Sequence, residues 1–559
     1  MKTATINEKL TISDQIQLSD LQGLASAGVE TLICNRPDGE DPDQPTFTEI
    51  SAQAEALGLR AVHQPIVPGQ MTGSDIDAFR SEIDAASGKV HAYCRTGTRS
   101  ITLWSMSEAQ RGLDAQGLID KAETHGYDLS GLAEKLCQAC PTPPKSADAK
   151  QFDIVIVGGG AGGISVASSL LKRAGDLSIC IVDPAEVHYY QPGWTMVGAG
   201  VFSQEQTVRS MASLIPDAVT WIKEAVASFQ PGANQVTLED GGCLAYQQLV
   251  VAPGLKLNWG AIEGLSETLG QNGVTSNYRY DLAPYTWKLV QGLKSGKAVF
   301  TQPPMPIKCA GAPQKAMYLS SDHWLKQGVL KNIDVEFCNA GPVLFGVQDY
   351  VPALMEYVKK YDATLSFGHN LIKIDGPAKT AWFEVKDADG NSTLVEKHFD
   401  MIHVCPPQCA PDFVRNSELA DASGWLDVDQ TTLQHKRFEN VWSLGDVQNA
   451  PNAKTAAAAR MQAPIVANNL LHALGKEAWV AHYNGYGSCP LTVERGKIVL
   501  AEFGYGGKLL PSFPSWLLDG RKPTRSAWWL KEIILPPIYW KAMLKGREWM
   551  VAPVPASKH

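Results

Sequence analysis

The stretch DIVIVGGGAGGISVASSLLKR, residues 153–173, decides the fold of most of this chain. It reads as a buried strand, a glycine-rich turn and a helix, with Gly158, Gly160 and Gly163 at G-x-G-x-x-G spacing. The first glycine makes the turn, the second lets the backbone approach a pyrophosphate, and the third packs helix on strand. Asp183 ends the next strand twenty residues after Gly163, where a carboxylate can bind a ribose hydroxyl. The pattern predicts a dinucleotide-binding α/β domain.

Composition limits what surrounds this motif. A chain of 559 residues is long enough for two or three domains. Its formal charge of −9 argues against broad nucleic-acid binding. The N-terminus is polar, so we expect no signal peptide, and eleven cysteines that are thiols in a reducing compartment. Cys137 and Cys140 form an isolated C-x-x-C, and we predict no metal site because no further ligands are spaced nearby.

The residues before the glycine-rich turn are predicted to form a separate unit. Strand-like and helix-like segments alternate over residues 1–140, which favours a parallel α/β sheet. Residues 141–151, which are charged and contain proline, are predicted to be a linker. The second unit is then expected to run over residues 152–550.

One loop of the first unit carries candidate chemistry. In YCRTGTRS, residues 93–100, four residues separate Cys94 from Arg99. Backbone N–H groups of such a loop, and the dipole of the helix that follows, favour a thiolate, which is the nucleophile. Arg99 can hold an anionic substrate through two hydrogen bonds. Cys94 and Arg99 are therefore the predicted catalytic residues of this unit.

The length of this loop distinguishes two chemistries. Tyrosine phosphatases use five intervening residues, whereas the four found here resemble the rhodanese loop, which carries one sulfur as a persulfide. With the segments at 35–40 and 65–73, the unit resembles the phosphatase-like domain of β-lactamase hydrolase-like proteins. The resemblance implies a sulfurtransferase with a phosphatase fold. Phosphatase activity, with Asp38 or Asp41 as the acid, is the alternative.

Two later stretches resemble flavoproteins of the disulfide-reductase type. LVVAPGLKLN, residues 249–258, resembles the strand that crosses beneath the cofactor and contributes Pro253 and Gly254. VWSLGDVQN carries Gly445 and Asp446, which resemble the pair that holds the ribityl chain of FAD. The resemblance implies FAD and two Rossmann domains. The predicted division is FAD-binding at 152–290 and 400–480, an NAD-domain-like region at 291–399, and a membrane or dimer region at 481–559.

The electron donor is expected not to be NAD(P)H. Enzymes of this fold that use it carry a second glycine-rich turn in the central domain. At that place, PIKCAGAPQKAMYLS, residues 306–320, holds a single glycine, Gly311. A pyrophosphate cradle needs three. The sequence offers Cys309 there instead.

The segment around Cys309 closely resembles sulfide:quinone oxidoreductases, including the mitochondrial type, and so do residues 188–200, 424–446 and 483–491. The resemblance implies that sulfide attacks a cysteine disulfide, that Cys309 becomes a persulfide, and that electrons pass through FAD to quinone. The sulfur then leaves on a small thiol or on sulfite.

One position departs from the mitochondrial type, in which the second redox cysteine follows the Gly-Asp pair. Here that position is Val447. Cys405 is the first candidate for the second thiol and Cys409 the second, because their segment is expected to approach the flavin. Cys489 matches the family without an obvious chemical role. Lys315, six residues after Cys309, is expected to be solvated.

The C-terminal tail, residues 526–551, interleaves aromatic and basic residues. Pro536 and Pro537 are predicted to split it into two short amphipathic helices, too short and too charged to span a bilayer. This composition suits peripheral attachment to a membrane that holds the quinone; packing in a homodimer is the alternative. The predicted location is a bacterial-type cytoplasm, on the inner face of the cytoplasmic membrane.

Together these features predict a bifunctional flavoenzyme that oxidises sulfide with FAD and quinone, fused to a cysteine-persulfide sulfurtransferase. The alternative is an NADH:quinone reductase-like flavoprotein fused to a cysteine-dependent phosphatase. A redox scaffold without FAD would be the third.

Overall fold

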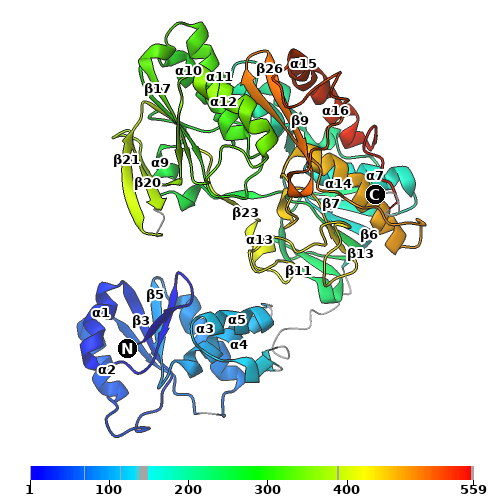
Figure 1. The fold of residues 1–559 in the computed structure, drawn as a ribbon. Coiled ribbons are helices and arrows are strands. Elements are labelled where there is room, and N and C mark those ends of the chain that lie inside the picture. The colour runs from blue at the N-terminus through cyan, green and yellow to red at the C-terminus, as the bar shows by residue number, and fades with distance from the viewer. Residues whose placement is uncertain are drawn as a thin grey trace. The chain divides into compact units, whose positions relative to one another are not determined.

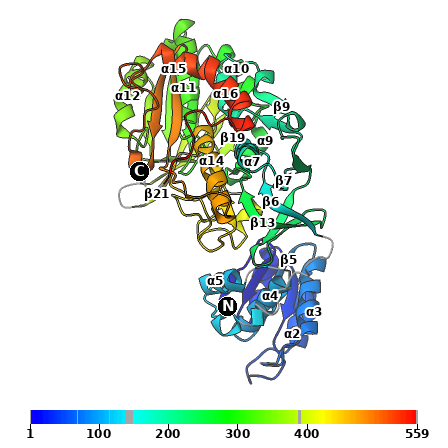
Figure 2. The same cartoon turned by 90° about the vertical axis from the view of Figure 1, so that its right-hand side faces the viewer.

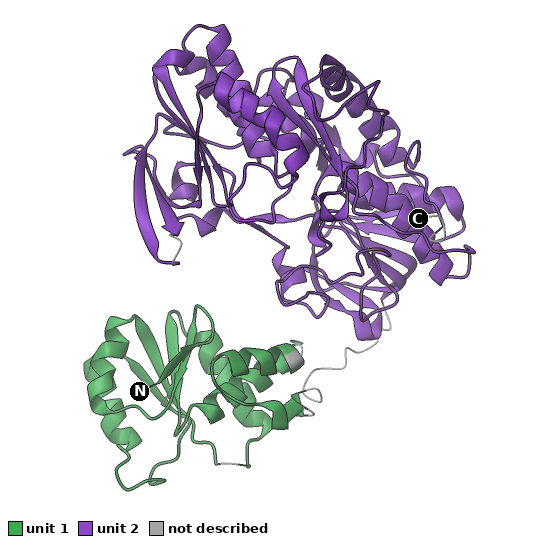
Figure 3. Cartoon of the chain, viewed as in Figure 1, with its two compact units in different colours: residues 1–147 green, residues 148–559 purple. Residues whose placement is uncertain are grey.

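The computed structural model describes residues 2–67, 69–111, 113, 115–133, 135–136, 149–386 and 390–555. It divides the chain into two compact units, Met1–Ala147 and Asp148–His559 (Figure 3). Cys137, Cys140 and most of the predicted linker lie outside the described residues.

A five-stranded sheet forms the centre of the first unit (Figure 1). Its two edge strands on one side are antiparallel and all other neighbours are parallel. In spatial order the strands are β1 (Thr3–Thr5), β2 (Leu10–Ser13), β5 (Lys89–Tyr93), β3 (Val29–Cys34) and β4 (Arg60–His63).

Helices cover both faces of this sheet, and each face has its own apolar core. One face packs on α1 (Leu21–Ser26) and α2 (Phe47–Ala56). The other packs on α3 (Gly73–Ala85), α4 (Thr98–Gln110) and α5 (Ala115–Thr124). Cys94 follows β5 directly and precedes α4, so the central parallel strand delivers it to the carboxyl edge of the sheet, where α/β folds place their ligands.

The second unit contains two sheets of Rossmann type. The first has a parallel core with an antiparallel flank, and β6 and β24 both pair with β13. Its strands, in spatial order, are β10 (Val219–Ile222), β7 (Ile179–Val182), β6 (Lys150–Val157), β13 (Cys243–Val251), β12 (Gln235–Leu238) and β11 (Val226–Gln230), with β24 (Val441–Ser443) beside β13.

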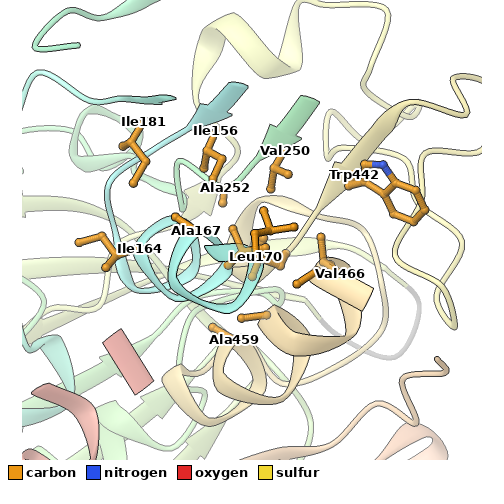
Figure 4. Close-up of a cluster of buried hydrophobic side chains, with 14 of the residues drawn as sticks. Ile156, Ile164, Ala167, Leu170, Ile181, Val250, Ala252, Trp442, Ala459 and Val466 are labelled. Atoms are coloured by element: carbon orange, nitrogen blue, oxygen red, sulfur yellow. The ribbon is translucent and has the colours of Figure 1, made fainter. Parts of the chain in front are cut away.

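Two helices cover one face of this sheet, α7 (Ala161–Arg173) and α14 (Ala456–Ala473), which lie side by side. Ile156 and Val250 of the strands meet Leu170 and Val466 of the helices in one apolar cluster (Figure 4). The helices come from segments almost 300 residues apart, so the domain is built from two separate parts of the chain.

The second sheet is entirely parallel. Its strands, in spatial order, are β15 (Val274–Thr275), β22 (Met401–His403), β16 (Gly296–Gln302), β17 (Ile333–Asn339) and β18 (Thr364–Phe367). One face packs on α10 (Ala283–Gly292), α11 (Ala312–Lys326) and α12 (Val351–Lys360). The other packs on an antiparallel sheet of β19 (His369–Asp375), β20 (Thr380–Lys386) and β21 (Ser392–His398).

The limits of this second domain differ from the predicted 291–399. Strand β15 and helix α10 precede residue 291, and strand β22 begins at Met401. The two strands are only two and three residues long. Such short buried runs carry too little periodicity to mark a domain limit in the sequence.

A hairpin and a helical tail complete the second unit. The hairpin, β25 (Gly487–Glu494) and β26 (Lys497–Phe503), packs on α11, and the tail packs on β26 and then on α7 (Figures 1 and 2). The tail consists of α15 (Arg525–Trp529), a π-helical turn (Leu530–Ile534) and α16 (Leu535–Lys541), in direct succession.

The predicted break at Pro536 and Pro537 is therefore wrong. Both prolines fall in the first turn of α16, where a missing N–H is tolerated and the fixed φ suits a helix. The helical course continues through them. No helix within the described part of the chain is long and apolar enough to cross a membrane.

Candidate active site

The glycine-rich turn of the second unit has the geometry of a phosphate cradle. Gly158 has φ of +103°, and a Cβ there would lie 2.5 Å from the Ala252 carbonyl oxygen. A Cβ on Gly163 would lie 1.8 Å from the Gly158 carbonyl oxygen. Gly160, the N-cap of α7, faces open space instead. Two of the glycines thus permit close packing, and the third leaves room for a ligand at the helix N-terminus, where the dipole favours an anion.

Asp183 braces this turn. Its Oδ2 accepts a hydrogen bond from Gly159 N at 2.6 Å, and its Oδ1 accepts one from Ala185 N at 2.8 Å. Pro253 lies on the other side, because a Cβ on Gly158 would lie 2.7 Å from Pro253 Cα. Gly254 and Gly445 follow the neighbouring strands β13 and β24; both have positive φ and face open space. The predicted cofactor residues therefore line one edge of one sheet.

The residues beyond Gly445 fit a polar cofactor. Gln448 is fully buried, and neither atom of its side-chain amide has a partner among the described residues. Burial raises the pKa of Asp446, and the charges of Lys454 and Lys308 oppose that effect. Buried polar groups of this kind require hydrogen-bonding partners. A bound dinucleotide with a polyhydroxyl chain would supply them, so the site fits FAD.

Cys309 lies on the loop between β16 and α11, half-buried, against a second thiol. Its Sγ lies 3.6 Å from Sγ of Cys489, which comes from β25 and is 2% exposed. Lys315, in the first turns of α11, donates from Nζ to Cys309 Sγ at 3.1 Å. Lys315 is itself 2% exposed, so the expectation of a solvated lysine is wrong: the helix direction points its side chain inward.

The pKa values of the two thiols are shifted in opposite directions. A hydrogen bond from Cys489, and then the Lys315 charge, hold the pKa of Cys309 well below its ordinary value. The hydrogen bond to Cys309, together with burial, raises the pKa of Cys489. Burial opposes the charge on Lys315, but the two sulfurs raise its pKa overall. The lowered pKa of Cys309 favours its thiolate, in contact with the Cys489 sulfur and the Lys315 amine, which is the condition for a reactive cysteine.

A second buried lysine comes from the tail. Lys531, in the π-helical turn, is 5% exposed and interacts electrostatically with Cys309 and Cys489. Burial, and then the neighbouring Lys315 charge, lower the pKa of Lys531 to about 7. The tail therefore supplies part of the thiol site.

The cysteine loop is tied to the predicted cofactor edge through Lys454. Cys309 N donates to the Lys454 carbonyl oxygen at 2.8 Å. Lys454 Nζ in turn donates to the carbonyl oxygens of Asp446 at 2.8 Å and Gln448 at 2.6 Å. Three hydrogen bonds thus connect the thiolate-bearing backbone to the turn predicted to hold the ribityl chain.

Cys405, the predicted partner, occupies a different environment. It is 1% exposed and belongs with Tyr278 to an apolar cluster that Cys309 also touches. Its sulfur accepts a hydrogen bond from Gln408 Nε2 at 3.7 Å. Burial raises the pKa of Cys405 to about 12, which disfavours its thiolate. Cys409, on β23 (Gln408–Cys409), pairs by its backbone with Lys256. The structure brings Cys489, rather than either of these, against Cys309.

The first unit builds its cysteine site differently. Gly97 N donates to Cys94 Sγ at 3.1 Å, and Cys94 is fully buried. Arg99 points its guanidinium to Glu40, with Nη2 to Oε2 at 2.7 Å, and to the Ile66 carbonyl oxygen at 3.0 Å. Glu40 was not singled out in the sequence, where it lies 59 positions before Arg99.

Arg99, which the sequence analysis assigned to an anionic substrate, is therefore paired with Glu40. The hydrogen bond from Arg99 is the largest cause of the lowered pKa of Glu40. Of the two candidate acids, Asp41 pairs with Arg36 and Arg95, and Asp38 accepts from Phe47 N. Within the described residues no cluster of three metal ligands occurs.

Two parts of the chain match known protein families. Residues 152–290 match the pyridine nucleotide-disulphide oxidoreductase family, and residues 2–111 match the phosphatase-like domain of β-lactamase hydrolase-like proteins. The chain is 45% identical over 401 residues to a mitochondrial sulfide:quinone oxidoreductase of Dictyostelium discoideum, covering 70% of this chain and 86% of that protein. The corresponding mouse protein is 39% identical over 71% of this chain and 87% of its own length.

The fold and site therefore define a flavoprotein of the disulfide-reductase type, and the chain belongs to the sulfide:quinone oxidoreductase family. The predicted fold class and family are confirmed. The crystal structure of the enzyme from Aquifex aeolicus has the same fold, with 21% identity, a TM-score of 0.59 and coverage of 71% of this chain and 92% of that one. A β-lactamase hydrolase-like protein of Agrobacterium fabrum is 38% identical over 23% of this chain and 30% of its own length.

The predicted location is wrong. The oxidoreductase relatives at 38–45% identity, from Dictyostelium discoideum, mouse and Schizosaccharomyces pombe, are mitochondrial proteins. They point to mitochondria rather than to a bacterial-type cytoplasm. The prediction rested on the absence of an apolar signal peptide, which does not distinguish among compartments without export.

Proposed function

We propose that the second unit oxidises sulfide to sulfane sulfur at Cys309 and passes two electrons through FAD to a quinone. The observation that carries this proposal is the Cys309 sulfur, with Lys315 Nζ at 3.1 Å, on a backbone that is hydrogen-bonded to Lys454 beside Asp446. Two-electron acceptance followed by reoxidation by quinone is the chemistry that FAD supplies when bound. The names of the relatives support the substrate and the acceptor.

Different residues of the chain would bind the cofactor, attract the substrate and position the cysteine loop. The open N-terminus of α7 at Gly160 would take the pyrophosphate, and Asp446 and Gln448 would face the ribityl chain. Lys315 and Lys531 attract hydrosulfide anion and neutralise negative charge on sulfur. Lys454 fixes the distance between the cysteine loop and the cofactor edge.

The test is anaerobic. Purified holoprotein mixed with sulfide should lose its oxidised-flavin absorbance, and a quinone should restore it. Cys309→Ser should abolish the loss, whereas Cys243→Ser, at a half-exposed thiol on β13, should not. Retention of oxidised flavin by the unmodified protein in excess sulfide would refute the proposal.

We expect NADH to be a poor electron donor, because the single glycine of the central loop packs against β25. Gly311, the lone glycine of the central loop, is the N-cap of α11. A Cβ there would lie 2.3 Å from Leu491 Cδ2 and 2.6 Å from Cys489 Sγ. This glycine therefore serves the close approach of β25 rather than a pyrophosphate. NADH is expected to leave the flavin oxidised; rapid reduction would favour an NADH:quinone reductase.

For the first unit we propose sulfur transfer by Cys94, which would receive sulfane sulfur and pass it to a small thiol or to sulfite. The four-residue spacing and the Gly97 N–H bond to the sulfur support it, as does the Arg99–Glu40 pair, which places a carboxylate beside the arginine that a phosphate ester would need. Fusion to the second unit would raise the effective concentration of the sulfur donor.

Labelled sulfide separates this proposal from a phosphatase. Wild-type protein with quinone should carry labelled persulfide on Cys94, and Cys94→Ser should lose it while the flavin still reacts. Turnover of an aryl phosphate that Cys94→Ser abolishes would support the phosphatase alternative instead. Equal rates of sulfur delivery from fused and separately expressed units would remove the rationale for the fusion.

We also propose that the tail attaches the second unit to a membrane. Trp529 is 58% exposed and Ile533 50%, on a helix that turns Lys531 inward, and Trp516 and Trp549 are exposed nearby in the chain. Exposed tryptophans suit the headgroup region. The protein should sediment with anionic lipid vesicles, and Trp529→Ser with Ile533→Ser should reduce this without changing turnover of a soluble quinone. Sedimentation velocity without lipid tests the alternative, that this surface forms a homodimer.

A further inference from the structure

The tail reaches the glycine-rich turn through a buried histidine that the proposed reaction does not use. His188 lies on β8 (Val187–Tyr189). Its Nδ1 is 3.2 Å from the Gly159 carbonyl oxygen, and its Nε2 is 2.6 Å from the hydroxyl oxygen of Tyr539. Tyr539 belongs to α16 and is also buried. One imidazole ring therefore joins the tail to the turn before α7.

The chemistry of the three groups fixes the direction of both hydrogen bonds. A carbonyl oxygen only accepts, so Nδ1 of His188 carries the hydrogen and donates it to Gly159. Burial lowers the pKa of His188 to about 4, so the ring is neutral at pH 7 and its Nε2 carries no hydrogen. Nε2 therefore accepts from the Tyr539 hydroxyl. Without that hydroxyl, a buried ring nitrogen would lose its hydrogen bond, which is costly.

Gly159 is held at both of its backbone polar groups. Its N–H donates to Asp183 at 2.6 Å, and its carbonyl oxygen accepts from His188. That carbonyl belongs to the same planar peptide unit as the N–H of Gly160, the N-cap of α7. In a trans unit the N–H points opposite to the C=O. Holding the Gly159 carbonyl toward His188 therefore sets the direction of an N–H group at the helix N-terminus.

We propose that His188 and Tyr539 are positioning residues for FAD, through which the tail holds the glycine-rich turn in the orientation that binds the pyrophosphate. This rests on the placement of the pyrophosphate at α7 under the proposed function. An N–H group that already points in a fixed direction binds a phosphate oxygen without being ordered first, and such preorganisation increases affinity.

The contact belongs to a packed aromatic interface. Tyr539 packs on Tyr190, with ring centroids 4.8 Å apart. The next residue, Trp540, lies under the Arg209 guanidinium, 5.1 Å from it. Arg209 pairs with His188 across a two-stranded antiparallel sheet. Adjacent residues of α16 therefore contact both strands of the hairpin that carries the histidine.

The residues that follow α16 are also anchored to α7 itself. Ser168 Oγ donates to the Leu544 carbonyl oxygen at 2.9 Å. Arg173, in the last turn of α7, donates from Nη2 to Glu548 Oε2 at 2.7 Å, and both side chains are largely buried. These contacts hold the tail against the helix whose N-terminus forms the cradle. The Tyr539 hydroxyl is thus a donor in a fixed place.

The rate at which the holoprotein releases FAD tests the proposal, followed as the rise in flavin fluorescence after dilution. Tyr539→Phe keeps the ring, and release should be about 3- to 10-fold faster. His188→Leu also removes the donor to Gly159, and release should be about 10- to 50-fold faster. Tyr361→Phe is the matched control, because its buried hydroxyl donates to the Val493 carbonyl oxygen at 2.8 Å in the other domain. Control release should equal that of the wild type; wild-type rates in both test variants would overturn the proposal.

A double variant separates this coupling from a loss of packing. If Tyr539 acts through His188, the chain with both Tyr539→Phe and His188→Leu should release FAD no faster than His188→Leu alone. Two independent structural effects would instead multiply. Release from the double variant at the product of the two single effects would overturn the proposal.

Gly160→Val tests the placement on which the proposal rests. A Cβ on Gly160 meets nothing within 4 Å, so the chain tolerates it, but the side chain would occupy the cradle. FAD release should be more than about 10-fold faster. Unchanged release would overturn the placement and this inference together. FAD-loaded wild type that sulfide does not reduce, but that releases FAD as expected in the variants, would refute the proposed reaction and leave this inference standing.

Discussion

Cys94 and Cys309 each follow a strand that pairs in parallel with its neighbours and precede a helix, yet the surroundings of the two sulfurs differ. Cys94 is fully buried and receives a backbone N–H from Gly97. Cys309 is half-buried, touches a second thiol and receives a buried ammonium from Lys315. Backbone dipoles can hold one sulfur in a fixed place, whereas a thiol pair with a mobile proton can also change oxidation state. The difference suits one site to carrying sulfur and the other to removing electrons.

We expect the largest effect on the difference between the two sites from removing the Lys315 ammonium beside Cys309. Lys315→Met should raise the pKa of Cys309 toward its ordinary value, because the Lys315 charge is one of the causes that lower it. Alkylation of Cys309 at neutral pH should slow by about 10- to 100-fold, and its pH midpoint should move upward. Lys315→Arg should retain most of the reactivity. An unchanged pH profile in Lys315→Met would show that the Cys489 hydrogen bond alone sets the reactivity.

The corresponding change in the first unit is Gly97→Ala. Gly97 has φ of +85°, and a Cβ there would lie 2.4 Å from the Tyr127 hydroxyl oxygen. The first unit should lose about 1–3 kcal/mol of unfolding free energy, and labelling of Cys94 with sulfur should fall. Gly28→Ala, at φ of +80° with nothing within 4 Å, separates backbone strain from loop damage. Equal loss of labelling in both variants would contradict a specific role for the Gly97 N–H.

A change at Lys531 tests the thiol site of the second unit through its effect on the free energy of unfolding. Its pKa is about 7 in the folded chain and 10.5 ordinarily. The unfolded chain therefore binds more protons between these values, and the unfolding free energy should rise with pH across that window. Lys531→Met should flatten this rise and stabilise the protein at pH 7 by about 1–2 kcal/mol. Chemical denaturation at several pH values measures it; a steeper rise in the variant would be the contrary result.

Glu40→Gln gives the smallest expected effect. The pKa of Glu40 is lowered, chiefly by Arg99, so the pair stabilises the first unit above the ordinary pKa of 4.5 and the contribution is lost as pH falls below it. The variant should lose no more than about 1 kcal/mol at pH 7, because the carboxylate is partly exposed. Denaturation at pH 7 and pH 4 should show the difference shrink at pH 4.

Local sequence patterns predicted much of this molecule, whereas contacts between residues that are distant in the sequence were not predicted. The glycine-rich turn at 158–163 and the strand–cysteine–helix order around Cys94 depend on neighbours in sequence, so the residue types alone indicated them. The pairing of Cys309 with Cys489 depends on how β25 packs on α11, which no local pattern encodes. Cys489 lies in a segment that resembles the family, but this resemblance did not indicate which residue Cys489 contacts.

The Arg99–Glu40 pair was missed for the same reason: the fold joins residues that 59 positions separate. The tail was misread for another. Prolines usually end a helix, but Pro536 and Pro537 fall where a new turn begins after a π-helical one. The position of the two prolines in the first turn of α16, rather than the composition of the tail, allows the helical course to continue.

That π-helical turn has one more consequence. Within five residues it turns Lys531 into the protein and leaves Ile533 in solvent, beside Trp529. Under the proposed membrane attachment, a membrane that bound the outer side chains would therefore contact the same five-residue segment that supplies Lys531 to the two thiols. Lifting the segment would withdraw that cation.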